Sequence, residues 1–191
     1  GKLTANGVVT LDNYALNKAD LDLSWKDFHL LQSDIADGFF NAEINLKGSS
    51  DKYSIGGTIK SDYIDINIPE TSNQSIPELN IVKKDEEKSK QSILNKVVLN
   101  LQYIADNRIF VRGWGLDAEF GGKILIKGDL DNPKFDGRLQ SIRGRYEEFG
   151  KRFNLTKANL NFFGTIPPSP NLDITAETQA DDVLAKINLT G

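Results

Sequence analysis

Few side chains in this sequence have the chemistry of a catalytic or metal-binding centre. The chain of 191 residues contains one histidine and no cysteine, which excludes disulfides, a thiolate nucleophile and the usual structural zinc or iron–sulfur sites. His29 stands without any Gly-x-Ser-x-Gly sequence that could supply a serine partner, so it is typical of an ordinary turn or strand histidine. We therefore predict no catalytic residues, no metal site and no cofactor.

Two pairs of adjacent carboxylates are the remaining candidates for chemistry, Glu147-Glu148 and Asp181-Asp182. A glycosidase needs two carboxylates about 5–10 Å apart that converge on one bond. Adjacent residues of a strand point to opposite faces, so neither pair is expected to converge. A carbohydrate-active or other enzyme on a β-sandwich therefore ranks well below a non-enzymatic function.

The charge and the hydropathy of the chain exclude two further classes of protein. The 23 basic and 27 acidic residues give a net charge of −4, which argues against a nucleic-acid partner held by a basic field. No apolar run approaches the roughly 18–20 residues that cross a bilayer, and no signal peptide opens the chain. The sequence begins with Gly1 and not with methionine, and Gly1 already lies in a segment with the alternating pattern. We therefore expect the sequence to be a piece of a longer protein.

The elements that must position all side chains are predicted to be strands. Apolar residues occupy every second position in many segments, which places one row of side chains on a buried face and the other in water. Helical spacing is hard to find, so we predict an all-β fold. The rows are Leu21, Leu23, Trp25; Ala42, Ile44, Leu46; Ile64, Ile66, Ile68; Val97, Leu99, Leu101, Tyr103; Leu172, Ile174, Ala176; and Val183, Ala185, Ile187, Leu189.

Breaks rich in Gly, Asn and Asp separate these segments at residues 48–51, 121–122, 131–133 and 164–170. Their spacing is typical of an antiparallel meander. A weak repeat accompanies them, because Gly48 is followed nine residues later by Gly57 and Gly128 nine residues later by Gly137. Repeated hairpins predict an elongated sheet in which each unit contacts its neighbours.

One segment departs from the strand pattern. Residues 69–92 contain two prolines and a run of mixed charges from Lys83 to Lys90, a composition that predicts a solvated loop or a disordered insert. The chain is thus divided into a β-repeat block at 1–68, the polar insert at 69–92 and a second β block at 93–191. The second block is expected to continue the first.

Something must cover the apolar rows, because an exposed row promotes aggregation. A packed sandwich, a closed barrel and a curled sheet with an apolar inner groove would all do so, and a groove could hold acyl chains. Sequence alone leaves a packed core and a lipid groove as open alternatives. The predicted inner positions are Ile124, Ile126, Leu139, Ile142, Phe153, Leu155, Leu160, Phe162, Leu172, Ile174, Ile187 and Leu189.

A set of motifs in residues 109–191 resembles the C-terminal domain of the TamB family, of the translocation and assembly module. The resemblance depends on several motifs in the expected order: a glycine-rich segment after an arginine, an arginine-glycine pair with an aromatic residue, a glycine-lysine pair before a phenylalanine, and a late glycine and proline. Residues 1–70 fit by their general β-repeat character. The motif residues are Arg112, Gly113, Gly115, Arg143, Gly144, Tyr146, Gly150, Phe153, Gly164 and Pro170.

The resemblance implies a fold and a place in the cell. TamB-like proteins belong with bridge-like lipid-transfer proteins, whose elongated antiparallel sheets curl into a β-taco with an apolar inner groove. They are periplasmic chains of diderm bacteria, anchored in the inner membrane by an N-terminal helix that this sequence lacks. No catalytic residues carry over from the family.

The resemblance also implies two functions of different classes. One is to shield phospholipid acyl chains in the groove during transport from the inner to the outer membrane, as part of outer-membrane biogenesis. The alternative is a scaffold for the assembly of outer-membrane proteins such as autotransporters, a form of protein secretion, in which a sheet edge pairs with a client strand or with the outer-membrane barrel subunit TamA.

Overall fold

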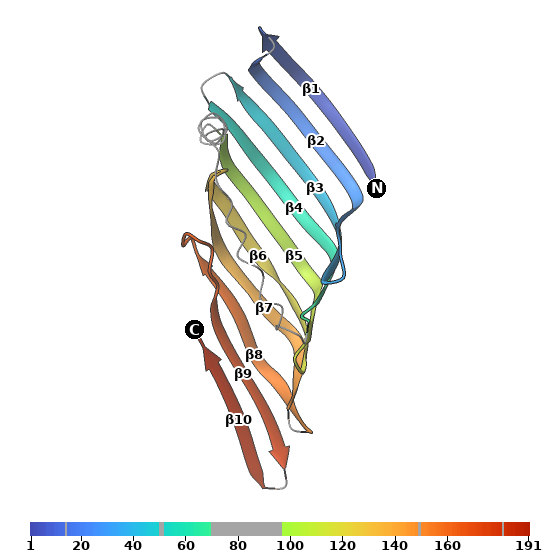
Figure 1. Ribbon diagram of the computed structural model, residues 1–191, viewed down its shortest axis with the longest axis vertical. Helices are drawn as coiled ribbons and strands as arrows, with labels where there is room; N and C mark the ends of the chain where they lie inside the picture. The colour runs from blue at the N-terminus through green and yellow to red at the C-terminus, as the bar shows by residue number, and fades with distance from the viewer. Residues whose placement is uncertain (14, 50–51, 70–96, 149, 181) are drawn as a thin grey trace, which may run out of the picture.

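The computed structural model describes the chain as one sheet of ten strands arranged in chain order (Figure 1). It describes residues 1–13, 15–49, 52–69, 97–148, 150–180 and 182–191, with the side chains of residues 15 and 180 left out of the description. The strands are β1 (Lys2–Asp12), β2 (Ala15–Gln32), β3 (Ala36–Ser49), β4 (Lys52–Asn67), β5 (Val97–Gly113), β6 (Leu116–Asp129), β7 (Asn132–Glu148), β8 (Lys151–Phe163), β9 (Asn171–Ala180) and β10 (Val183–Thr190).

The sheet is long and open. Strands β1 and β10 lie at its opposite ends, and each strand pairs with its neighbours in the order of the chain (Figure 1). The prediction of an all-β, elongated curled sheet is therefore confirmed. Within the described part of the chain, no helix is long and apolar enough to cross a membrane.

One junction departs from the predicted antiparallel order. Strands β4 and β5 run parallel, with Tyr53 opposite Val97 and Asn67 opposite Arg112. A parallel pair needs a crossover of a dozen or more residues, whereas an antiparallel pair can be joined by a tight turn. Residues 68–96 form this connection, and the predicted polar insert at 69–92 falls within it. Apart from Pro69, that insert lies outside the described residues.

A line of register shifts crosses the sheet. Each shift inserts extra residues into one strand of a pair, which bends the strand and increases its twist. The shifts of neighbouring pairs lie in line from β2 to β9, and β7 and β8 are unpaired between Gln140 and Arg145 on the same line without a shift; we call this line the crease. The shifts lie at Trp25/Phe28, Phe39/Phe40, Lys60/Ile64, Ala105/Ile109, Glu119/Phe120 and Leu155/Lys157.

The most buried side chains follow the crease on one face of the sheet. Several of them are alanines, and small side chains allow bent strands to approach one another on the concave side. We call this face, which carries the buried cluster, the inner face and the opposite face the outer face. The cluster consists of Phe40, Ile64, Ala105, Ile109, Ala118, Phe120 and Ala158.

The predicted break at residues 121–122 is wrong, because both glycines lie inside β6. They lie where β6 meets the bulge of β5. A Cβ on Gly121 would come within 2.6 Å of the carbonyl oxygen of Asp106. Glycine here permits the close approach of two strands at the crease and does not end a strand.

The internal repeat corresponds to two hairpins, β3–β4 and β6–β7. Gly57 and Gly137 occupy matching positions, with φ of +128° and +141°. A Cβ would lie 2.0 Å from the carbonyl oxygen of Glu43 in the first hairpin and 2.3 Å from that of Lys123 in the second. Both glycines curve the neighbouring strands in the same way, as glycine kinks do in curved sheets.

Candidate functional site

The inner face carries apolar rows that cross the strands from one end of the sheet to the other. Residues directly opposite in register share a face, so Tyr103, Ile124 and Phe162 lie in line through Gly137. The face extends to β10, where Ile187 lies opposite Ala176. The candidate site is therefore a face of the sheet and not a single pocket.

The register places the predicted inner residues on this face, with one exception. Ile142 lies at the shift between β6 and β7, where Phe120 pairs with Ser141 and Glu119 with Arg143. It has no partner in β6 and is 50% exposed. The inner-face positions are Ile124, Ile126, Leu139, Phe153, Leu155, Leu160, Phe162, Leu172, Ile174, Ile187 and Leu189.

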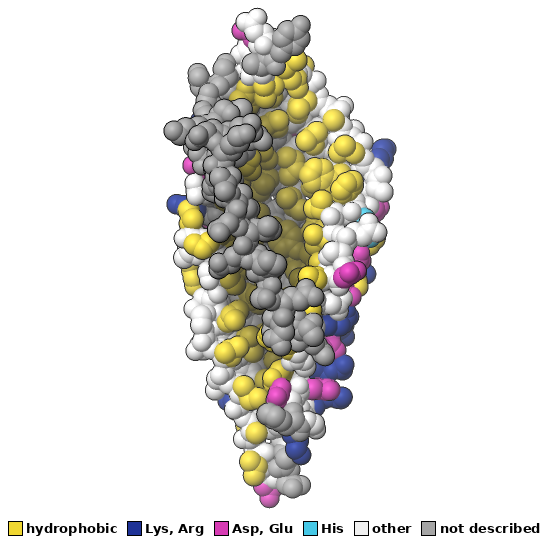
Figure 2. Space-filling model, in the orientation of Figure 1, with side chains coloured by type: hydrophobic (Ala, Val, Ile, Leu, Met, Phe, Trp, Pro, Cys, Tyr) yellow, Lys and Arg dark blue, Asp and Glu magenta, His cyan; other side chains and the backbone are white. Residues whose placement is uncertain are grey.

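Most side chains of the inner face remain partly accessible. Ile124 is 7% exposed, but Ile187 and Leu189 are 39% and 53% exposed. No large side chain in the described part of the chain is fully buried, whereas a close-packed domain core encloses several. Figure 2 shows hydrophobic side chains gathered over the upper part of the face in view, with charged side chains along its lower right rim.

Two hydroxyls pair near the crease on the inner face, and the indole N–H of Trp25, at the shift in β2, is buried without a hydrogen-bond partner among the described residues. Ser61, which is 3% exposed, lies 2.9 Å from the hydroxyl of Tyr103, and either oxygen can donate. Burial raises the pKa of Tyr103, and the hydrogen bond with Ser61 opposes that shift. Both groups thus stay neutral at physiological pH, which suits an apolar face.

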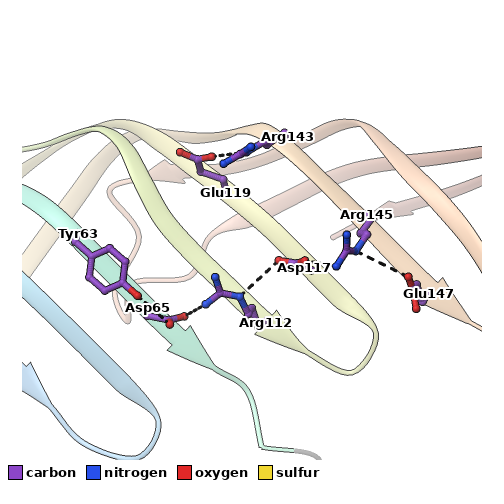
Figure 3. A network of polar contacts seen from close by, with 8 residues as sticks. All are labelled: Tyr63, Asp65, Arg112, Asp117, Glu119, Arg143, Arg145 and Glu147. Atoms are coloured by element: carbon purple, nitrogen blue, oxygen red, sulfur yellow. Dashed lines mark hydrogen bonds and ion pairs between the residues drawn. The ribbon is translucent and has the colours of Figure 1, made fainter.

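The outer face of the same strands carries a ladder of ion pairs (Figure 3). Arg112 on β5 contacts Asp65 on β4 and lies 3.6 Å from Asp117 on β6. Arg145 on β7 lies 2.8 Å from Asp117 and 3.9 Å from Glu147. The ladder crosses the parallel β4–β5 junction, and exposed pairs of this kind stabilise a fold by about 0–1 kcal/mol each.

Glu119 is the buried carboxylate of the outer face. Its side chain accepts hydrogen bonds from Arg143 Nε at 2.6 Å and from the backbone N–H of Arg108 at 3.1 Å. Arg108 lies in the β5 bulge and has a φ of +66°. Glu119 therefore fixes the geometry of the bulge at the crease.

The other residues with potential chemistry have structural partners. His29 contacts Asp37 and stacks on Phe39 with ring centroids 4.3 Å apart. Glu147 lies 2.8 Å from Arg152 Nε, whereas Glu148 accepts a hydrogen bond from the hydroxyl of Tyr146. Asp181 of the second acidic pair lies outside the described residues.

The family-motif residues divide between the two faces and the turns. Arg112 and Arg143 lie on the outer face, while Tyr146 and Phe153 pair on the inner face. The turn residues include Gly150 and Gly164, each with a φ of +70°. The motif thus consists of positions that build the bent sheet. The others are Gly113, Gly115 and Gly144, in or beside the β5–β6 turn and on β7, and Pro170, which directly precedes β9.

Comparison with known families decides the identity of this sheet. A family model described as the TamB C-terminal domain matches residues 1–191. The chain belongs to this family. The match covers β1–β4 as well as the later strands, so the TamB domain extends over the residues that resembled the family only by their β-repeat character.

A similar protein is the translocation and assembly module subunit TamB of Haemophilus influenzae. It is 24% identical to this chain over 171 residues, which cover 80% of the chain. The chain spans 13% of the length of that relative. It therefore corresponds to a small part of a long TamB protein.

Sequence reasoning missed the partners that hold the TamB sheet in its bent form. Asp65 and Arg112 are far apart in the chain and meet only because β4 and β5 are parallel. Ser61 and Glu119 lie in ordinary alternating strands, and their burial depends on the crease. Asp117 lies 12 residues before Asp129 and Arg145 lies 13 residues after Asn132, the pair that closes their hairpin, so the bulge between them hides even this outer-face pair from a count along the chain.

Proposed function

We propose that this domain shields phospholipid acyl chains on its inner face, as a non-enzymatic, periplasmic segment of a TamB protein in a diderm bacterium. Membership of the TamB family supports a role in a translocation and assembly module. The proposed role is transport of phospholipid from the inner to the outer membrane during outer-membrane biogenesis. The full-length protein would be anchored in the inner membrane by a helix.

The observation that carries this proposal is the partial exposure of the inner-face rows. Apolar residues line up from β2 to β10, yet no large side chain among the described residues is fully buried. Each acyl methylene removed from water against such a face gains about 0.8 kcal/mol. An open sheet also allows a polar head group to stay in water while the tail lies on the face. This role needs no cofactor and no catalytic residue.

The test compares two neighbouring residues of β7 that point to opposite faces. Leu139 lies on the inner face opposite Leu160, and Gln140 lies on the outer face opposite Asn159. We expect Leu139→Arg to remove most of the phospholipid that co-purifies with the domain, as measured by native mass spectrometry. Gln140→Arg adds the same charge to the same strand and should leave the lipid bound.

Circular dichroism of both variants checks that the sheet still forms. A second inner-face variant, Phe162→Arg, tests a different strand. If the wild-type domain carries no lipid, or if the folded Leu139→Arg and Phe162→Arg variants keep it, the proposal fails.

A second candidate function is a scaffold for outer-membrane protein assembly, with TamA and outer-membrane protein clients as partners. The end strands favour it, because β10 is exposed along its whole length and pairs only with β9 among the described strands. Such an edge can accept an incoming strand by β-augmentation.

Photocrosslinkers placed within residues 183–189 should capture an unfolded outer-membrane barrel segment, whereas crosslinkers in the central strand β6 should not. Equal capture at both places would contradict the scaffold function.

A further inference from the structure

The outer face of the β6–β7 hairpin carries four cations arranged as two opposed pairs. In register, Lys127 lies directly opposite Lys134, and Lys123 lies directly opposite Arg138. Like charges in directly opposed positions destabilise a sheet. All four side chains are exposed. We call these residues the basic hairpin surface: Lys123, Lys127, Lys134 and Arg138.

The matching hairpin β3–β4 lacks this arrangement. At the equivalent positions Lys47 lies opposite Ser54, and Glu43 lies opposite Thr58. Lys47 also lies 3.5 Å from the carboxylate of Asp20 on β2. The same hairpin geometry thus exists without opposed cations, so the fold does not require them.

Carboxylates offset the basic hairpin surface only in part, since Asp106, which pairs with Lys60, also attracts Lys123. None of its four residues forms an ion pair within the described residues, in contrast to Arg112 and Arg145 on the same face. Arg138 donates from Nε to the side-chain oxygen of Asn161 at 2.7 Å, which leaves its charge uncompensated. Asp136 is an exposed carboxylate between the pairs, opposite Leu125.

An exposed aromatic side chain lies beside these cations. Phe163 on β8 is opposite Asp136 in register, so it projects from the outer face next to the basic hairpin surface. It is 70% exposed. Lysine and arginine next to an exposed aromatic side chain are typical of surfaces that bind the interface of an anionic bilayer.

We infer that the outer face of the β6–β7 hairpin docks on the surface of an anionic lipid bilayer. The opposed cations contact lipid phosphates, and Phe163 enters the head-group region. This docking surface is separate from the inner face, because Lys123 and Ile124 are neighbours that point to opposite sides of the sheet. The domain can therefore lie on a membrane without covering the face proposed to hold acyl chains.

A membrane fits these features better than an acidic protein or a nucleic acid. Both of those partners would match the cations alone, whereas the bilayer interface also accommodates the exposed ring of Phe163. Further along the same face Arg143 and Arg145 pair with Glu119 and Asp117, so a long polyanion has no continuous track of unpaired cations to follow.

The test is co-sedimentation of the 191-residue chain with vesicles of equimolar phosphatidylglycerol and phosphatidylcholine, and with vesicles of phosphatidylcholine alone. We expect binding to the anionic vesicles and weakening of that binding at high salt. The double variant Lys127→Gln, Lys134→Gln should weaken the apparent affinity about thirtyfold, from the loss of two cations near the surface. Phe163→Ser should also weaken it.

The matched control is the double variant Lys47→Gln, Lys52→Gln in the β3–β4 hairpin, which removes the same charge and should change the affinity less than about twofold. Equal loss in both double variants would overturn the assignment of the surface. Equal binding to neutral vesicles would also overturn it, since that result reports contact through the inner face. So would salt-dependent association of the chain with itself in the absence of vesicles, measured by sedimentation velocity, which would assign the cations to a second copy.

Discussion

The hairpins β3–β4 and β6–β7 agree on the inner face of the sheet and differ on the outer face. On the inner face Gly57 lies opposite Ile44 and Gly137 lies opposite Ile124, with the same close approach to the neighbouring backbone. On the outer face one hairpin has mixed polar residues and the other has opposed cations. The comparison teaches that strand curvature constrains the inner positions, whereas the outer positions are free to acquire a partner of their own.

The largest effect is expected from a Cβ at the matching glycines. Gly57→Ala and Gly137→Ala should each lower the free energy of unfolding by about 3 kcal/mol or more, because both have a backbone conformation suited to glycine and the Cβ would meet a carbonyl oxygen. Urea denaturation followed by circular dichroism measures this. Gly150→Ala is the control: its φ is +70° and no atom lies within 4 Å of the added Cβ, so its cost is about 1–2 kcal/mol. A cost of that size at Gly57 or Gly137 would show that the hairpins relax around the methyl group.

The next effect is expected from the isoleucines opposite these glycines. Ile44 and Ile124 are 9% and 7% exposed, so truncation to alanine should cost each hairpin about 2–3 kcal/mol. The exposed outer-face Lys127→Ala should change stability by less than about 0.5 kcal/mol. Unequal costs at Ile44 and Ile124, again measured by urea denaturation, would contradict the equivalence of the two inner faces.

The outer face has one position at which we expect a loss comparable to that of an inner residue. Glu119→Ala removes the acceptor of the Arg108 N–H in the β5 bulge and should cost about 1–3 kcal/mol. Glu147→Ala removes a more exposed carboxylate that also pairs with arginines and should cost about 0–1 kcal/mol. Hydrogen exchange at the amide of Arg108 should accelerate in the first variant only. If both variants behave alike, Glu119 does not fix the crease.

The smallest effect has the opposite sign. Lys134→Ser installs in β6–β7 the residue that β3–β4 has at the same position, and it removes a like charge opposite Lys127. We expect the free energy of unfolding to rise by about 0.2–1 kcal/mol, and the gain should shrink in high salt. Thermal melts at two ionic strengths measure this, and a loss of stability would mean that the opposed cations do not repel.

Period-two alternation predicted the strands and most inner-face positions, because alternation fixes the face of a side chain whatever the pairing of its strand. It failed at Ile142, since one extra residue in a bulge reverses the relation between position and face. Composition carries no signal for such an insertion. The contact of the inner-face residues with lipid stays a prediction.

The direction of β5 and the ion ladder could not be predicted for a different reason. Parallel and antiparallel strands show the same alternation when one face is apolar, so the sequence around Val97 does not reveal the parallel junction. The length of the connection at 68–96 was the only available signal. Without the register of β4 and β5, the pairing of Asp65 with Arg112 follows from no local pattern.

The parallel junction has a consequence for the order of folding. The other strand pairs are joined by short connections and can pair starting from their turns, whereas pairing β4 with β5 first requires the ends of the connection at residues 68–96 to meet, at an entropic cost that grows with the length of the connection. We therefore expect strands β1–β4 and β5–β10 to form as two cooperative units before they join. Until they do, β4 and β5 each present an unpaired edge. The β4 edge of one molecule can then meet the β5 edge of another, so protein concentration becomes a variable in refolding and domain-swapped dimers are its product.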